Sequence, residues 1–174
     1  MKGAIESMQN GAAHASPWQT FEAVFGLPLL LAIGLQIVVP LASPGAPLRL
    51  LCIVGGAGLI VVGLAFVITA RRELARRNQP TDPGHPTTQV VTTGVFSISR
   101  NPLYLGGVCF LVGAALAAGL LWELVLLPPS VLACHYILIA PEESYLLGKF
   151  GDKYGEYAKT VHRWLGRKTD LPGR

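Results

Sequence analysis

Charged residues are scarce in this chain of 174 residues, where Asp, Glu, Lys and Arg together make up 14% and hydrophobic residues make up 51%. A soluble globule of this size would have too little polar surface to cover itself. The few charges also fall into separate blocks, which leaves long apolar runs between them. This composition predicts an all-α protein embedded in a membrane.

Cysteine is scarce too, and histidine forms no cluster. Cys52, Cys109 and Cys134 all lie in apolar runs, without a CxxC spacing. We therefore expect small buried side chains here, and neither a disulfide framework nor a metal site.

Other familiar signals are missing. Residues 1–20 are polar and lack a basic region joined to a short apolar core, so we do not expect a cleaved signal peptide. The net charge is +4, but no nucleic-acid-binding module accompanies the basic residues, and we expect no nucleic-acid partner. No glycine-rich nucleotide-binding fold, internal repeat or separate soluble domain is recognisable, and the oligomeric state stays open.

Four apolar runs are present, and they predict about four membrane-spanning helices at residues 23–42, 48–70, 103–119 and 120–140. The first two contain about twenty residues or more, enough for a helix to cross about 30 Å of hydrocarbon. A cytoplasmic loop at 71–102 and a cytoplasmic tail at 141–174, which includes a helix, complete the predicted domain 21–174.

The boundary between the third and fourth runs is ambiguous. Pro128 and Pro129 lie inside the fourth run and are expected to kink or break its helix. We place the turn at residues 119–123, because Trp122 and Glu123 suit a membrane interface. The alternative is a longer third helix that ends near Leu127, followed by a short fourth one.

Basic residues predict the orientation. Loop 71–102 carries five arginines and the tail seven lysines or arginines, whereas the first interhelical loop has only Arg49. By the positive-inside rule, the loop, the tail and both termini are cytoplasmic. Contact with anionic lipid headgroups is also expected.

The third and fourth runs form a hairpin that brings distant residues together. Arg100 directly precedes the third run and Glu142 follows the fourth, so both are expected at its cytoplasmic end. The proline-rich stretch 80–86 cannot be helical, and residues 88–94 favour an extended chain that ends at a glycine. These features predict a pocket lined by opposite charges and capped by residues 80–100.

The pocket residues suit a ligand with charges of both signs. Glu142 can pair with a positive centre, and Arg100 can hold a carboxylate or an anionic substrate. Main-chain groups near Val90 and Val91 can bond an adenine edge. Taken singly, Glu142 and Arg100 also fit a helix first turn and an interfacial anchor, and Tyr104 fits an aromatic belt.

Two further features of the hairpin and tail are ambiguous. His135 is an ionisable residue seven positions before Glu142, which predicts a functional side chain next to that carboxylate; the alternative is a neutral histidine bonded to a neighbouring helix. Phe150, Tyr154 and Tyr157 follow the i, i+4, i+7 spacing of one helix face. Core packing of the cytoplasmic end is favoured for them over substrate contact.

The stretch Arg100-Asn101-Pro102-Leu103-Tyr104-Leu105-Gly106, together with Glu142-Glu143 and Phe150-Gly151, carries a family resemblance. An Arg-(His or Asn)-Pro-x-Tyr-x-Gly element and a later Glu-Glu pair flank a helical hairpin in the isoprenylcysteine carboxyl methyltransferase and phospholipid methyltransferase superfamily. The chain resembles that superfamily from about Arg72 to Trp164. The combination is far more specific than either part.

This resemblance implies that S-adenosylmethionine is the methyl donor. The implied cofactor-binding residues are Thr88, Gln89, Val90, Val91, Phe96, Asn101, Pro102, Leu103, Tyr104, Glu142 and Glu143. Arg100 and His135 are the candidate catalytic residues. Asn101 replaces the histidine of the protein-carboxyl branch and gives the form seen in bacterial relatives, which suggests a bacterial cytoplasmic membrane. Leu138 replaces an arginine that the branch associates with the prenylcysteine carboxylate, which disfavours that substrate.

The expected activity is methyl transfer from S-adenosylmethionine to a lipophilic or membrane-partitioned acceptor at the cytoplasmic face. A phospholipid amine, a lipophilic carboxylate and a small thiol remain open as acceptors. An amine or thiol must lose a proton, for which His135 is the candidate base. The alternative is a noncatalytic four-helix membrane protein, such as a transporter subunit or assembly factor. A transporter would place charged residues at mid-membrane on several helices, whereas here they lie at one edge.

Overall fold

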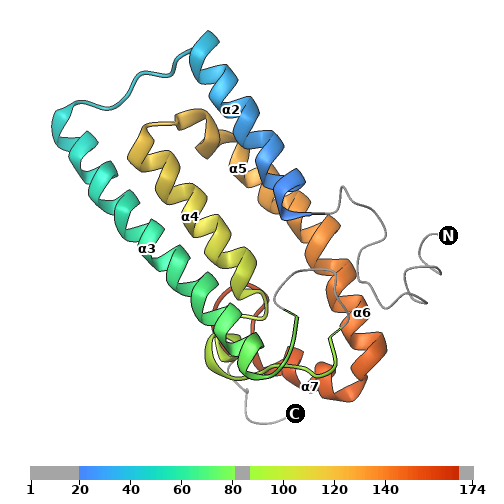
Figure 1. The fold of residues 1–174 in the computed structure, drawn as a ribbon. Coiled ribbons are helices and arrows are strands. Elements are labelled where there is room, and N and C mark those ends of the chain that lie inside the picture. The colour runs from blue at the N-terminus through green and yellow to red at the C-terminus, as the bar shows by residue number, and fades with distance from the viewer. Residues whose placement is uncertain (1–19, 81–86, 169–174) are drawn as a thin grey trace, which may run out of the picture.

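The computed structural model describes residues 20–80 and 87–168, and in these ranges the regular elements are helices (Figure 1). They are η1 Glu22–Gly26 (π), α2 Leu27–Val38, α3 Ala46–Arg76, η2 Gly94–Ser97 (3-10), α4 Pro102–Ala118, α5 Leu121–Cys134, η3 His135–Ile139 (π), α6 Ala140–Phe150 and α7 Asp152–Thr160. The predicted all-helical fold is confirmed. The described chain has no strand, and its single β-bridge pairs Val161 with Arg167.

The long helices form an antiparallel bundle. Helix α3 packs along α4, α2 packs along α5, and α4 and α5 join the two pairs. The α2/α3 connection and the α4/α5 turn lie at one end of the bundle (Figure 1). The other end, called the site end below, holds the last turns of α3, the start of α4 and α7 (Figure 1).

The apolar runs become helices with shifted bounds. The second is longer than expected, at Ala46–Arg76, and the third matches within one residue. The first ends at Val38 instead of residue 42, because Val39 precedes a proline and takes a non-helical conformation with φ −132° and ψ 75°. Only the helices of 31 and 30 residues are long enough by themselves to qualify as spans among the described residues.

The most apolar part of α3 faces outward. Only 11% of its most apolar 18-residue window is buried, whereas the core helix of a soluble protein would be mostly covered. Its outer face presents Leu51, Val54 and Val61, each more than half exposed. Such a surface suits lipid, so the structure supports a helical membrane protein.

The proline pair was expected to kink or break its helix, and a break at Pro128 and Pro129 is wrong. Helix α5 continues through both prolines, and η3 and α6 extend it without interruption to Phe150. Packing against α2 and α4 holds the helix although two N–H donors are missing. The irregularity falls instead at the π-helix His135–Ile139.

Helices α3 and α4 approach each other through glycines. A Cβ atom on Gly63 would lie 2.6 Å from the Gly106 carbonyl oxygen, and one on Gly113 would lie 2.6 Å from that of Gly56. The two pairs are one heptad apart, so the backbones touch at successive levels. This packing fixes the position of α4 along α3. It therefore also fixes the residues at the start of α4, such as Pro102.

The α4/α5 turn forms where expected. Gly119 ends α4 with φ 76°, a left-handed conformation that suits glycine. The Trp122 indole N–H donates to the Val39 carbonyl at 2.8 Å. Glu123 does not lie at an exposed interface as expected, because it is only 1% exposed beneath the packed helices.

The cysteines are all free thiols. Cys134 is buried as expected, but Cys52 and Cys109 are partly exposed on the apolar helices. The described residues contain no group of His, Cys, Asp and Glu side chains that could hold a metal ion.

Candidate active site

A cavity opens at the site end of the bundle, with a volume of about 830 Å³ including its open mouth. Its lining residues are Leu74, Pro80, Thr87, Gln89, Val90, Val91, Phe96, Arg100, Asn101, Pro102, Leu103, Tyr104, Glu142, Leu146, Tyr154 and Tyr157.

The cavity gathers most of the residues singled out from the sequence. Arg100 and Glu142 both line it, as the hairpin geometry predicts. Of the other candidates, it is lined by Gln89, Val90, Val91, Phe96, Asn101, Pro102, Leu103 and Tyr104. Thr88, Glu143 and His135 are not part of its lining and make other contacts.

Gln79 holds the capping segment against the end of α3. Its Oε1 accepts from the Thr88 main-chain N–H at 2.8 Å and from that of Gln89 at 3.3 Å, while its Nε2 donates to the Thr88 hydroxyl at 2.8 Å. Gln79 is 6% exposed, so this contact is buried. Thr88 thus anchors the segment, and the main chain of Val90 and Val91 makes no hydrogen bond within the described chain.

Glu142 has no cationic partner among the residues that the structure describes. The Tyr104 hydroxyl donates to its Oε2 at 3.2 Å, and none of the ion pairs among the described residues includes it. A carboxylate that lines a cavity without a counterion is suited to bind a positively charged ligand.

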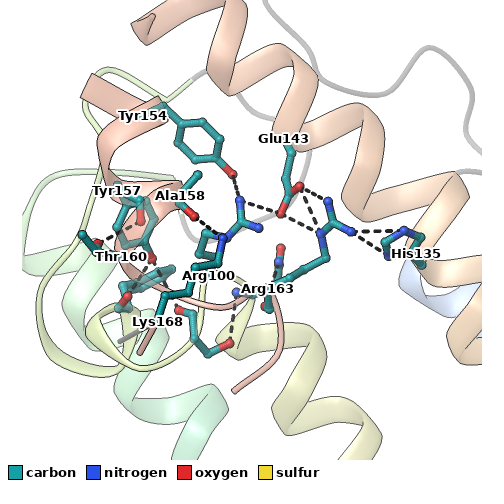
Figure 2. A network of polar contacts seen from close by, with 12 residues as sticks. Arg100, His135, Glu143, Tyr154, Tyr157, Ala158, Thr160, Arg163 and Lys168 are labelled. Carbon is teal, nitrogen blue, oxygen red and sulfur yellow. Dashed lines mark hydrogen bonds and ion pairs between the residues drawn. The ribbon is translucent and has the colours of Figure 1, made fainter. Parts of the chain in front are cut away.

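Glu143, the next residue, is surrounded by cations (Figure 2). Arg163 Nε donates to its two oxygens at 3.0 and 3.1 Å, and Arg163 Nη2 also donates to Oε2. Arg100 Nη1 lies 3.1 Å from Oε1. The Glu143 side chain is 13% exposed and that of Arg100 10%. Two guanidinium groups therefore share one largely buried carboxylate.

Arg100 is held on one side only. Its Nη1 also donates to the Tyr154 hydroxyl at 3.4 Å, whereas its Nε is buried without a hydrogen-bond partner. Burial is the main reason that the pKa of Tyr154 is raised to about 12; Glu143 adds to the effect and Arg100 opposes it. The tyrosine therefore stays neutral at physiological pH.

His135 lies beside the site and does not line the cavity. Arg163 Nη1 is 3.2 Å from its Nε2 and 3.4 Å from its Nδ1, and its ring meets the Tyr136 ring edge-on. The expected neighbour was Glu142, on the assumption of a regular α-helix. The π-helix His135–Ile139 has wider turns, which changes the rotation between the two residues.

The aromatic residues of the tail lie on two helices instead of one. Gly151, with φ 52° and ψ −129°, separates Phe150 in α6 from Tyr154 and Tyr157 in α7. Both tyrosines are buried, as core packing requires, yet they also line the cavity. The Tyr157 hydroxyl donates to the Phe96 carbonyl at 2.6 Å. The aromatic spacing was the signal for these residues, but it does not separate packing from ligand contact.

The segment after α7 is a part of the site that sequence reasoning missed. The Arg100 main-chain N–H donates to the His162 carbonyl at 3.1 Å, and that of Gly166 donates to the Ile98 carbonyl at 2.7 Å. Asn101 Nδ2 donates to the Arg163 carbonyl at 3.1 Å. A single arginine in a basic tail gave no signal for this role.

The comparisons with known proteins agree with the geometry. The model of the family described as phospholipid methyltransferase matches residues 51–153, which include the cavity residues of α4 and Glu142. An uncharacterized protein of Haemophilus influenzae is 49% identical over 35 residues, which cover 20% of this chain and 56% of that protein. The chain thus spans about half the length of that relative. No solved structure matches it.

Proposed function

Because this chain belongs to the phospholipid methyltransferase family, we propose that it transfers a methyl group from S-adenosylmethionine to a lipophilic acceptor in the membrane. Membership of the family implies a methyltransferase. The observation that carries the proposal is the cavity in which the uncompensated carboxylate of Glu142 and the free Nε of Arg100 share one lining.

The residues of the cavity fit this cofactor, which supplies an electrophilic methyl group on a cationic sulfonium and also carries an ammonium and a carboxylate. Glu142 provides a carboxyl group that has no cationic partner among the described residues. Arg100 Nε and Thr87 Oγ1 are buried polar atoms without partners, and both residues line the cavity. Buried donors of this kind are costly unless a ligand satisfies them.

Each wall has a proposed role. The main chain of Val90 and Val91, which makes no hydrogen bond within the described chain, pairs with the edge of the adenine, and Phe96 packs against it. Tyr104 fixes the rotamer of Glu142 through its hydroxyl. Arg100 holds the carboxylate of the donor. Asn101 ties this wall to the C-terminal segment.

Methyl transfer demands mainly positioning and the exclusion of water. A carboxylate or thiolate acceptor needs no base, whereas an amine or thiol must lose a proton. His135 lies outside the cavity lining and against Arg163, so we assign it no proton transfer. Leu138 is 1% exposed within the helical core, so its position offers an acceptor no contact.

We further propose that all four long helices cross a bacterial cytoplasmic membrane with the site end inside. Two of them are 17 residues long, close to the lower limit for a span. The basic residues at the end of α3, Arg71, Arg72, Arg76 and Arg77, lie at the site end, while Arg49 lies at the other. Reactivity of engineered cysteines at the two ends toward a membrane-impermeant reagent tests this orientation.

The test of the cofactor is calorimetric titration of the full chain in detergent with S-adenosylmethionine and S-adenosylhomocysteine. Glu142→Gln keeps the shape of the side chain and removes its charge. Glu156→Gln is the matched control, because the Glu156 side chain is 70% exposed and its one ion pair within the described ranges is with Lys159. We expect binding to the wild type and to the control, and at least about a tenfold weaker affinity in Glu142→Gln. A folded wild type that binds neither ligand contradicts the proposal.

Transfer of a labelled methyl group then identifies the acceptor. Vesicles that contain a phospholipid amine, a lipophilic carboxylic acid and a lipophilic thiol, supplied separately, distinguish the acceptor classes. Glu142→Gln serves as the inactive control in each assay.

A further inference from the structure

We infer that Arg163 is a positioning residue, which acts through Glu143 to hold Arg100 in the orientation that receives the carboxylate of the donor. This inference rests on the proposed function. It assigns a role to the segment of residues 161–168, which lies beyond the family match at residues 51–153. It also makes Glu143 a link between two arginines, whereas the family resemblance implies that it binds the cofactor.

The first step is the ion pair between Arg163 and Glu143. Its Nε bonds both carboxylate oxygens at 3.0 and 3.1 Å, and its Nη2 adds a further bond to Oε2. A bond at two points fixes the rotation of a carboxylate as well as its position. The other side of Arg163 rests on the ring of His135, so the guanidinium is itself braced (Figure 2).

The second step runs from Glu143 to Arg100. Glu143 Oε1 lies 3.1 Å from Arg100 Nη1, and that same nitrogen bonds Tyr154. Nη1 is thereby occupied, while Nε is buried without a partner. Arg100 Nη2 makes no hydrogen bond among the described residues. The edge that holds Nε and Nη2 thus has no partner among the described residues, and this edge is the fork that can bind a carboxylate at two points.

The third step concerns the backbone. The C-terminal segment bonds the main chain of Arg100 and of Ile98 and the side chain of Asn101. Arg163 therefore belongs to a segment that fixes both the main chain and the side chain of Arg100. Glu143, whose oxygens already face two guanidinium groups, is in this account a link between arginines and not a ligand of the cofactor.

The competing explanation is that Arg163 only stabilises the structure around the cavity. Two ligands that differ in one group distinguish this explanation from a positioning role. S-adenosylhomocysteine has the amino acid carboxylate, whereas 5′-methylthioadenosine has the same nucleoside but lacks that part. If Arg163 positions Arg100, its loss weakens binding of the first ligand only. A brace that holds the whole cavity together would affect both ligands.

The experiment measures the dissociation constants of both ligands for Arg163→Ala, Arg163→Lys and Glu143→Gln in the full chain in detergent. Arg167→Ala is the control, because this exposed arginine lies in the same segment and has the same charge. We expect S-adenosylhomocysteine to bind about ten- to a hundredfold more weakly to Arg163→Ala and Glu143→Gln, with less than about a twofold change for 5′-methylthioadenosine. Arg163→Lys should recover part of the affinity, since lysine restores the charge but not the fork.

The outcomes are distinct. An equal loss for both ligands, or no loss for either, in variants that remain folded at the temperature of the titration overturns the positioning role. If Arg163→Ala does not fold, Arg163→Lys and Glu143→Gln provide the same comparison. If the wild type binds neither ligand, the proposed function itself fails, which no result on Arg163 alone can mimic.

Discussion

The middle of the bundle and its site end are held together in opposite ways. Between α3 and α4 the closest approach is backbone on backbone, with Gly63 against Gly106. At the site end, the contacts are charges and hydrogen bonds, such as those that Arg163 makes with Glu143. The middle therefore depends on shape alone, and the site end depends on the identity of each polar atom.

This difference indicates how the chain separates stability from chemistry. The glycine contacts set the height of α4, and thereby deliver Pro102 and Tyr104 to the cavity. The polar residues then adjust within that frame. Changes in the middle should affect folding, whereas changes at the site end should affect ligand affinity more than folding.

The largest effect is expected for Gly63→Leu. A Cβ atom there lies 2.6 Å from the Gly106 carbonyl oxygen, so the helices must separate, at a cost of about 3 kcal/mol or more. Gly58→Leu on the same helix is the control, because a Cβ atom there has nothing within 4 Å. Thermal unfolding in detergent measures both. Equal unfolding temperatures would contradict the backbone contact.

Glu142 and Glu143 provide the next comparison, within a single helical turn. Glu143→Gln leaves two guanidinium groups without their carboxylate, so we expect a loss of about 2 kcal/mol in unfolding free energy. Glu142→Gln removes a charge that lacks a cationic partner, and we expect stability within about 0.5 kcal/mol of the wild type. Denaturant unfolding checks the order. A larger loss in Glu142→Gln would reverse the assignment of the two carboxylates.

Gln79→Ala tests the hydrogen bonds that hold the capping segment at Thr88 and Gln89. We expect affinity for S-adenosylhomocysteine to fall about tenfold, because the main chain of residues 88–91 loses the side chain that positions it. Gln36→Ala, a change at the opposite end of the bundle, is the control and should bind like the wild type. Calorimetric titration makes the comparison. An unchanged affinity in Gln79→Ala would show that the hydrogen bonds of Gln79 do not contribute to ligand binding.

The smallest effect is expected on the outer face of α3. Val61 is 67% exposed and lies only two residues from Gly63. Val61→Leu should change the unfolding free energy by less than about 0.5 kcal/mol, since an apolar outer face accepts any apolar side chain. A strong loss in a thermal melt would indicate that this face is covered by protein.

Much of the fold was accessible from local sequence properties. Hydropathy located the long helices, since apolar length is a property of consecutive residues. Pro128 and Pro129 misled, because packing against other helices decides whether a proline pair ends a helix. Gly151 gave no warning that it separates α6 from α7, because glycine permits a break without requiring one.

Local sequence patterns were enough for the helical class, the apolar runs and the placement of Arg100 and Glu142 at one cavity, because a hairpin brings its two ends together whatever its details. Only the tertiary structure decided that Glu142 faces the cavity without a counterion while Glu143 joins Arg100 to Arg163. The same holds for His135, which the π-helix turns toward Arg163. Such assignments depend on atoms brought together from far apart in the chain, and no local pattern of residues records which of two adjacent carboxylates they reach.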